Sequence, residues 1–279
     1  MIYKHPLMHN NFSKSDFSDI KKLLNQTNPI LTQSKKVEEF EKKWSKWLGV
    51  KYSTFVSSGS SANYISISIL KVLNKNKYKN EIIVPTLTWI SDISSIILNG
   101  FKPVFVDINL ENLSMDIDQV LKKISKKTLG IFITHAQGFN GLNDELLNIV
   151  KKKKIYLVED VCESHGATFK NKKLGTFGLV SNFSFYYAHH MTTIEGGMIS
   201  TNNKEVYEMS KILRSHGMAR ESKNKIYENR LIKKYNKLSP QFVFLYPTLN
   251  FRNNEIGACI GINQLKKLNE NNRKRKNNL

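Results

Sequence analysis

Short apolar runs alternate with polar or helical segments through most of the first 201 residues. Runs rich in Val, Ile and Phe predict seven strands, at 54–57, 81–85, 102–108, 128–135, 154–160, 181–187 and 196–201. Helical stretches such as SANYISISILKVL and SDISSIILN lie between several of these runs. Strands that are apolar on both faces and alternate with helices are typical of a mostly parallel sheet covered by helices. We therefore predict an α/β fold, with functional residues at the carboxyl ends of the strands.

An amphipathic helix is predicted ahead of the first strand. In KKVEEFEKKWSKWL, residues 35–48, the apolar positions recur every three or four residues at Val37, Phe40, Trp44 and Leu48. Such a stripe needs an apolar surface to cover it. This helix is therefore expected to pack on the body of the protein.

The strand pattern stops near residue 202, where charged helical sequence begins. We predict an N-terminal arm and a large domain in 1–201, and linker helices with the start of an incomplete C-terminal domain in 202–279. The apolar helix at 255–268 is expected to leave one face exposed, because little chain follows that could cover it. The basic run NENNRKRKNNL after it is predicted to be a frayed terminus.

Composition excludes several classes of protein. The 279 residues carry a formal charge of +20, but the lysines are spread over the whole chain, so we interpret them as solvated surface and expect no nucleic-acid partner. The two cysteines, Cys162 and Cys259, are too few for a disulfide framework, a four-ligand metal site or an iron-sulfur site. No signal-peptide pattern or membrane span is visible. We predict a cytoplasmic enzyme without a bound metal and without a membrane partner.

Two motifs have the residue types that bind an anionic and a cationic group. VSSGSSAN, residues 56–63, joins a strand to a helix through Ser58-Gly59-Ser60-Ser61, where free N–H groups and hydroxyls make a phosphate cradle. KIYLVEDVCESHGA ends a buried strand with Glu159 and Asp160, and a carboxylate there can hold a cationic ring nitrogen. The alternatives are a serine helix cap in the first motif and an aspartate that caps a turn in the second.

Two further motifs contain an aromatic residue and a histidine pair. VPTLTWISD places Trp89 after a strand, where an indole either packs in the core or stacks on a flat ligand. FYYAHHMTTIEGGM places His189 and His190 at a strand exit, where an imidazole is either structural or a proton carrier near neutral pH.

Taken in this order, the motifs resemble the DegT/DnrJ/EryC1/StrS sugar aminotransferase family, which has the aspartate aminotransferase fold and uses pyridoxal phosphate. The resemblance extends from ILTQSKKVEEFEKKWSKWLGVKY to LNFRNNEIGACIGINQLKKL. It implies that Ser60, Ser61 and Ser184 hold the cofactor phosphate. It also implies that Trp89 stacks on the pyridine ring and that Asp160 pairs with the ring nitrogen.

Three positions depart from the family pattern or reach beyond one subunit. Glu163 stands where the family usually has glutamine near the ring hydroxyl, and Ile194 stands where it often has glycine. Asn250, in LNFR, matches the residue that reaches the phosphate of a neighbouring subunit, so a homodimer with shared active sites is implied. Family members usually continue for about another hundred residues through a smaller C-terminal domain.

The most informative departure is His189, five residues after Ser184, at the position of the family's cofactor lysine. A histidine cannot form the Schiff base on which ordinary transamination depends. A branch of the family with the same change contains sugar 3-dehydratases, which use the amine form of the cofactor. In that branch the histidine acts as base and acid while the sugar's 3-hydroxyl leaves.

Residues 202–250 contain no cysteine, which favours the branch without an iron-sulfur cluster. The resemblance then implies a lyase that uses pyridoxal or pyridoxamine 5'-phosphate, with glutamate as amino donor and a nucleotide-linked 4-keto-6-deoxy sugar as substrate. Its implied pathway is dideoxysugar synthesis for lipopolysaccharide O-antigen. Two alternatives stay open, a nucleotide-sugar aminotransferase of the same family and an inactive, truncated binder.

Overall fold

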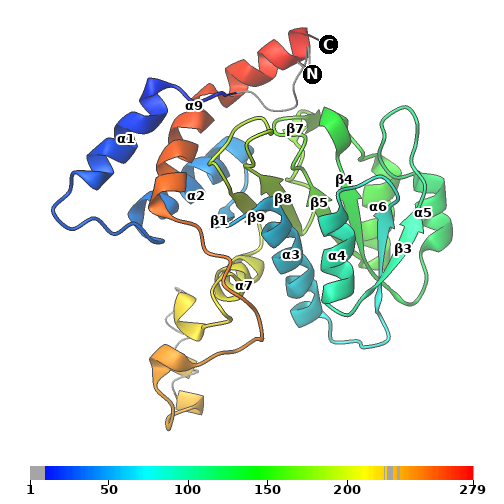
Figure 1. The fold of residues 1–279 in the computed structure, drawn as a ribbon. Coiled ribbons are helices and arrows are strands. Elements are labelled where there is room, and N and C mark those ends of the chain that lie inside the picture. Colours follow the sequence, from blue (N-terminus) through cyan, green and yellow to red (C-terminus); the bar gives the residue numbers. More distant parts are fainter. Residues whose placement is uncertain (1–9, 223, 225–228, 231–232, 279) are drawn as a thin grey trace, which may run out of the picture.

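The computed structural model describes residues 10–222, 224, 229–230 and 233–278 (Figure 1). The first nine residues of the predicted N-terminal arm lie outside the described residues. The helices are α1 (Lys14–Leu24), α2 (Lys35–Leu48), α3 (Gly59–Leu73), α4 (Ile90–Leu98), α5 (Ile117–Lys123), α6 (Asp144–Lys153), α7 (Lys204–Arg214) and α9 (Glu255–Asn277). Three short 3-10 turns are η1 (Ala136–Gly138), η2 (Ala219–Glu221) and η3 (Pro240–Phe242). No helix in this described part is long and apolar enough to cross a membrane.

A seven-stranded sheet forms the centre of the molecule, and it confirms the predicted fold class. Its strands are β1 (Tyr52–Val56), β2 (Glu81–Pro85), β3 (Lys102–Val106), β4 (Thr128–Thr134), β5 (Tyr156–Asp160), β8 (Val180–Ser184) and β9 (Gly197–Thr201). The spatial order is β1-β9-β8-β5-β4-β2-β3, and only β9 runs antiparallel to its neighbours. The short strands β6 (Thr168–Phe169) and β7 (Lys172–Lys173) form a separate hairpin. The predicted strand at 181–187 ends earlier, at Ser184, because Phe185 turns into the loop that contains the histidines.

Helices cover both faces of the sheet, as the two-sided apolar strands require. On β2, Ile82 and Val84 face a cluster that includes α3, α4 and α7, whereas Ile83 faces a cluster that includes α2, α5, α6 and α9. Side chains that alternate along a strand point to opposite faces, so one apolar run feeds two cores. The predicted helix at 35–48 is confirmed as α2, and its apolar stripe is buried. Helix α7, which follows residue 202, also packs on the sheet. The predicted domain boundary near residue 202 stays a prediction.

The expectation of an exposed apolar face on the last helix was wrong. In α9 the side chains of Ala258, Ile260, Ile262 and Leu268 are buried, because α1 and α2 pack against it. The frayed terminus was also a wrong prediction, since α9 continues through the basic run to Asn277 (Figure 1). The short apolar pattern of α1 gave too weak a signal to identify it as the partner of α9.

Glu255 joins α9 to the beginning of α2. Its buried carboxylate accepts hydrogen bonds from the backbone N–H groups of Ser34 at 2.9 Å, Lys36 at 2.8 Å and Val37 at 2.9 Å. The first N–H groups of a helix have no partner within the helix, and a negative charge there is favourable. Glu255 therefore caps the N-terminus of α2 from a helix that is distant in the sequence.

We expect Glu255→Ala to lower the free energy of unfolding by about 2–3 kcal/mol, because it leaves buried donors without an acceptor. Chemical denaturation of the chain without ligands measures the change. Glu255→Gln is the matched control, since it keeps one acceptor oxygen, and its cost should be smaller. Equal stability of Glu255→Ala and the wild type would show that water satisfies these donors.

Candidate active site

Four strand ends meet at one edge of the sheet and assemble the predicted site residues. Strands β8, β5, β4 and β2 are neighbours and parallel, so the segments after Ser184, Asp160, Thr134 and Pro85 emerge side by side. Strand β1 runs in the same direction as β8, because both pair antiparallel with β9. The serine motif that follows β1 therefore opens at the same edge.

The start of α3 forms a narrow cradle at this edge. A Cβ atom on Gly59 would lie 2.6 Å from the Ser184 Cβ and 3.2 Å from the Cys162 Sγ, so only glycine allows this approach. Gly197 is equally constrained, because its Cβ would lie 2.2 Å from the Ser58 carbonyl oxygen. The two glycines bring the helix N-terminus, the end of β8 and the loop after β5 together. Free N–H groups at such a position attract a phosphate.

Each serine of the motif has a different role. Ser58 is the N-cap, and its Oγ accepts from the Ser61 N–H at 3.0 Å. The Ser61 hydroxyl in turn contacts the Ser58 backbone, whereas the Ser60 side chain is exposed. The capping alternative is thus correct for Ser58. The phosphate-binding roles of Ser60, Ser61 and Ser184 stay predictions.

A pocket of about 490 Å³ opens beside this helix start, between α3, α4 and the segment around Phe251. Seven serines line it together with Tyr64, Leu98, Leu249 and Phe251. Leu98 and Leu249 are among the exposed large apolar side chains of the molecule. The pocket therefore combines hydroxyl groups with an exposed apolar rim.

Asp160 ends β5 with its carboxylate already oriented. Its Oδ1 accepts from the Cys162 N–H at 2.8 Å, and its Oδ2 accepts from the Asn63 side-chain amide at 3.1 Å. The side chain is buried. Within the described residues, Asp160 forms no ion pair, and a protonated ring nitrogen would supply the cation that such a buried carboxylate needs.

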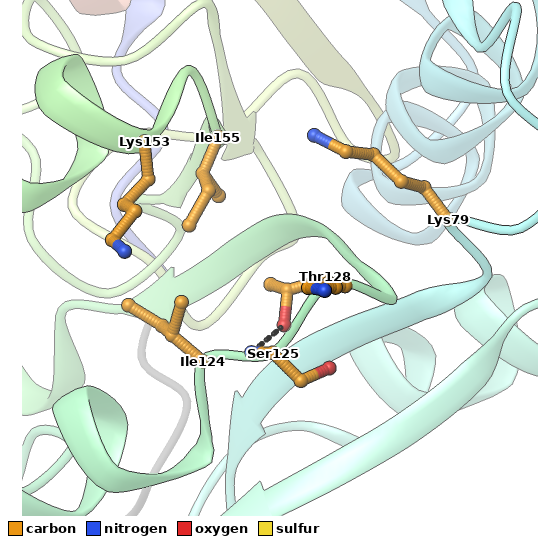
Figure 2. Close-up of a pocket in the computed structure, with 7 residues that line it drawn as sticks. Lys79, Ile124, Ser125, Thr128, Lys153 and Ile155 are labelled. Carbon is orange, nitrogen blue, oxygen red and sulfur yellow. Dashed lines mark hydrogen bonds between the residues drawn. The ribbon is translucent and has the colours of Figure 1, made fainter.

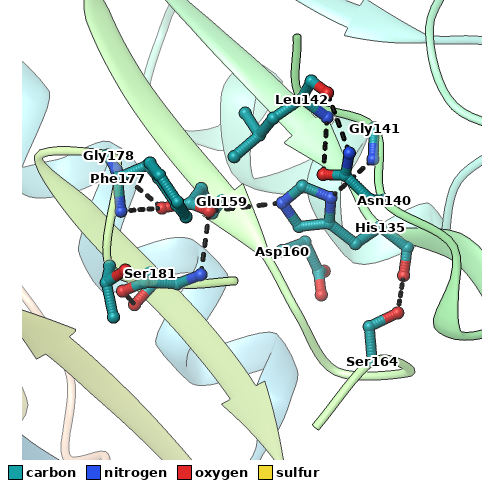
Figure 3. Close-up of polar contacts among 12 residues, drawn as sticks. His135, Asn140, Gly141, Leu142, Glu159, Asp160, Ser164, Phe177, Gly178 and Ser181 are labelled. Carbon is teal, nitrogen blue, oxygen red and sulfur yellow. Dashed lines mark hydrogen bonds and ion pairs between the residues drawn. The ribbon is translucent and has the colours of Figure 1, made fainter. Parts of the chain in front are cut away.

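A buried network under the sheet edge fixes the direction of Asp160 (Figure 3). The preceding residue, Glu159, accepts from His135 Nε2 at 3.3 Å, and His135 Nδ1 accepts from the Gly141 N–H at 3.2 Å. Glu159 also accepts three backbone N–H bonds, from Gly175, Phe177 and Gly178. Because successive side chains of a strand point to opposite faces, this anchorage of Glu159 turns Asp160 toward α3.

The two histidines in the loop between β8 and β9 have different surroundings. The His190 ring stacks on the buried His165 ring, with centroids 5.1 Å apart, and burial lowers the pKa of His190 to about 4. Burial also lowers the pKa of His189, while the negative charges of Glu163 and Asp160 act to raise it. His189 is thus mainly a neutral base at pH 7 and lies within the electrostatic reach of both carboxylates. His190 is packed as a structural residue.

Glu163, in the segment after β5, forms a hydrogen bond with η1. Its Oε2 accepts from the backbone N–H of Gln137 at 3.1 Å, and its charge raises the pKa of His189. This is the charge that a glutamine at the position would lack.

We expect Glu163→Gln to lower the pKa of His189 further, because it removes the largest cause that raises this pKa. A base works only when unprotonated, so the acid limb of the kcat/KM profile should move to lower pH. The exposed Glu145 on α6 supplies the control Glu145→Gln, which should leave the limb in place. An unmoved limb in Glu163→Gln would contradict the assignment, and NMR titration of the His189 ring gives the same comparison without turnover.

Three other positions that the sequence singled out have exposed side chains. Trp89 is 68% exposed immediately before α4, so the core alternative is wrong and its ring is accessible to a ligand. Asn250 is exposed, and its Oδ1 accepts from Arg252. Ile194 is exposed with φ +73°, a left-handed conformation that explains why glycine is common there. The roles of Trp89 and Asn250 stay predictions.

A second pocket, of about 380 Å³, lies at the opposite end of the strands (Figure 2). Its lining includes Lys79, Lys126 and Lys153, next to the first residues of β2, β4 and β5. It is therefore separate from the predicted site, and its lysines lie at the opposite end of the strands from Asp160 and Ser184.

Sequence reasoning missed the residues that support Asp160. Asn63 and Asp92 come from α3 and α4, and Thr88 and Thr134 join them. The one available signal was Asp92 itself, an acidic residue inside the apolar stretch SDISSIIL. Its partners depend on how two helices pack, which the spacing along the chain does not reveal.

The sequence model of the DegT/DnrJ/EryC1/StrS aminotransferase family matches residues 12–279. The chain belongs to this family. Among its relatives, the GDP-4-keto-6-deoxy-D-mannose 3-dehydratase of Escherichia coli O55:H7 is 35% identical over 271 residues, which are 96% of this chain and 69% of the relative. The enzyme of the same name from Yersinia pseudotuberculosis is 33% identical over 272 residues, 96% of this chain and 68% of the relative.

Solved structures agree with this assignment. The E. coli GDP-4-keto-6-deoxy-D-mannose-3-dehydratase with bound hydrated pyridoxal phosphate superposes with a TM-score of 0.85 at 32% identity, covering 96% of this chain and 69% of that chain. Aminotransferases are also among the relatives, such as the GDP-perosamine synthase of E. coli O157:H7, 33% identical over 190 residues, 68% of this chain and 51% of the relative. The family is thus a pyridoxal-phosphate-dependent one that contains both lyases and aminotransferases.

The residues present fit this cofactor. Because Gly59 has no Cβ, Ser184 packs closely against the start of α3, so the Ser184 hydroxyl lies next to the first turn of this helix, and Ser60 lines the adjacent pocket. In the described part of the chain no cation pairs with the Asp160 carboxylate, which suits a partner of a pyridinium nitrogen. The site therefore has a group for each charged end of pyridoxal phosphate.

Proposed function

We propose that this chain is a pyridoxamine-phosphate-dependent 3-dehydratase that acts on a nucleotide-linked 4-keto-6-deoxy sugar. The observation that carries the proposal is His189, which follows the cradle residue Ser184 at the lysine position of the family. Residues 174–203 contain no lysine at all. The 3-dehydratases among the relatives support the same activity.

Each residue of the site has a defined task in this reaction. When bound, the cofactor supplies an amine that can condense with a keto group, and a ring that accepts electrons. The start of α3 and Ser184 hold the phosphate, and Asp160 keeps the ring nitrogen protonated. With the cofactor and substrate bound, the His189 imidazole would act as the general base that takes up a proton and as the general acid that gives one to the departing 3-hydroxyl. Its neutral form at pH 7 suits the first of these tasks.

The proposal includes a homodimer with shared sites and glutamate as the amino donor. The exposed Leu98 and Leu249 at the rim of the serine-lined pocket support a covering subunit, and Asn250 is accessible there. Cytoplasmic synthesis of a dideoxysugar for lipopolysaccharide is the expected setting.

Product analysis tests the proposal. The chain is incubated with pyridoxal phosphate, glutamate and GDP-4-keto-6-deoxymannose, and the expected products are ammonia and a 3-deoxy sugar in equal amounts. A stable 4-amino sugar would instead support the aminotransferase alternative, which the perosamine synthase relatives favour. Failure to bind the cofactor would support the inactive binder.

A further inference from the structure

A second buried carboxyl, Asp92, lies beside Asp160 and has no role in the chemistry above. It belongs to the first turn of α4, and its side chain is completely buried. The Asn63 amide nitrogen lies 2.5 Å from Asp92 Oδ1 and 3.1 Å from Asp160 Oδ2, so it bridges the two carboxyl groups. The Asp92 side chain also contacts two threonine hydroxyls, which carry no charge, and a side-chain hydrogen bond with Asp160 is among the causes that raise its pKa. No ion pair of either carboxyl group is found in the part of the chain that the structure describes, and two close carboxyl groups without a cation cannot both be ionised at low cost.

Two threonine hydroxyls lie beside Asp92 Oδ2. This oxygen is 2.5 Å from the Thr88 hydroxyl oxygen and 3.0 Å from that of Thr134, and the two hydroxyl oxygens are 2.7 Å apart. A hydroxyl can donate to a carboxyl oxygen or accept from a protonated one, but it supplies no positive charge. These contacts therefore suit a neutral carboxylic acid and do not offset the cost of a buried negative charge.

The electrostatic surroundings also favour a protonated Asp92 side chain. Burial is the largest cause that raises the pKa of Asp92 well above 3.8, and the neighbouring Asp160 raises it further. Among the described titratable groups, Cys162 is influenced by both Asp92 and Asp160, and His189 is influenced by Asp160. None of these groups is a permanent cation that could hold Asp92 ionised.

We propose that Asp92 is a positioning residue, a neutral carboxylic acid that holds the Asn63 amide and, through it, the Asp160 carboxylate toward the cofactor's ring nitrogen. This role rests on the proposed function, because it presumes that Asp160 binds the ring. It leaves a single negative charge on the pair of carboxyl groups formed by Asp92 and Asp160. It also ties α3, α4 and β4 to the residue on which the cofactor depends.

The protonation state is tested on the chain without cofactor or substrate. Denaturation is compared over a range of pH for the wild type and for Asp92→Asn, which keeps the shape but does not titrate. A folded-state pKa raised above the unfolded value stabilises the fold at low pH and loses that contribution as pH rises through the folded pKa. Between the unfolded-state and the folded-state pKa of Asp92, the unfolding constant of the wild type should rise about tenfold per pH unit relative to that of the variant. Parallel curves would overturn the proposal.

An infrared spectrum of the wild type keeps the test independent of how the variant folds. A protonated carboxyl has a carbonyl stretch that carboxylates lack, and it should persist at neutral pH. Absence of this band would also overturn the proposal.

The positioning role is tested by cofactor binding and by the absorbance of the bound pyridine ring as pH varies. Asp92→Asn should behave like the wild type, whereas Asp92→Ala should bind at least tenfold more weakly and shift the absorbance profile. Wild-type behaviour of Asp92→Ala would overturn the role. A wild-type chain that binds no cofactor would overturn the proposed function and this role together, while the denaturation curves would still decide whether Asp92 is neutral.

Discussion

Replacing His189 by asparagine should lower kcat for 3-deoxy sugar formation by a factor on the order of 10²–10⁴, the usual contribution of a general acid and base. Asparagine can occupy a similar volume but cannot accept and return a proton. Binding of the cofactor should change little, because the cradle at α3 and the Asp160 carboxylate are untouched. The measurement is the initial rate with saturating keto sugar, alongside a cofactor titration.

The neighbouring histidine is the matched control for this variant. His190 stacks on His165 and has a pKa of about 4, so it neither gains nor gives a proton near neutral pH. His190→Asn should therefore keep most of the activity, although it loses a packed ring. Equal losses in both variants would show that the loop needs its packing and not the imidazole of His189.

Replacing Arg214 by methionine should lower the free energy of unfolding by about 3–5 kcal/mol, the largest effect on stability that we expect. The Arg214 guanidinium is buried and donates to Glu41 Oε1 at 2.7 Å and to the Phe55 carbonyl at 2.9 Å. Glu41 Oε1 also accepts from the Phe55 N–H at 2.9 Å. The pair therefore joins α7 and α2 to β1, and the variant leaves the Glu41 charge buried without its cation.

A double variant separates the lost charge pair from lost packing. Arg214→Met combined with Glu41→Leu removes the unpaired charge, so it should be more stable than the sum of the two single changes predicts. Urea denaturation of the wild type, the two single variants and the double variant gives the coupling energy between Arg214 and Glu41. Additive effects would show that the two side chains do not stabilise one another.

Much of the architecture could be predicted from the sequence, because it depends on local patterns. Two-sided apolar runs predicted the seven strands, and Asp160 was found at the end of its strand without knowing how the strands pair. Ser184 was identified only through the family resemblance, because the pattern predicted a strand that continued to residue 187. The capping role of Ser58 was also among the readings of its motif. Such features need only the residues within one element.

The remainder depends on contacts between distant elements. Asn63 meets Asp92 because α3 packs on α4, and Glu255 caps α2 from α9. The burial of α9 depends on α1, whose own apolar pattern is short. Nothing in the local sequence of these residues specifies a partner so far away along the chain.

Reduction with borohydride tests the central claim that His189 has replaced the lysine most directly. The wild type and His189→Lys are incubated with pyridoxal phosphate, reduced, and analysed by intact-protein mass spectrometry. We predict no mass increase for the wild type and an increase of one reduced cofactor for His189→Lys, located by peptide mapping at residue 189. A stoichiometric increase in the wild type would contradict the account, because it would show that another lysine of the chain binds the cofactor covalently.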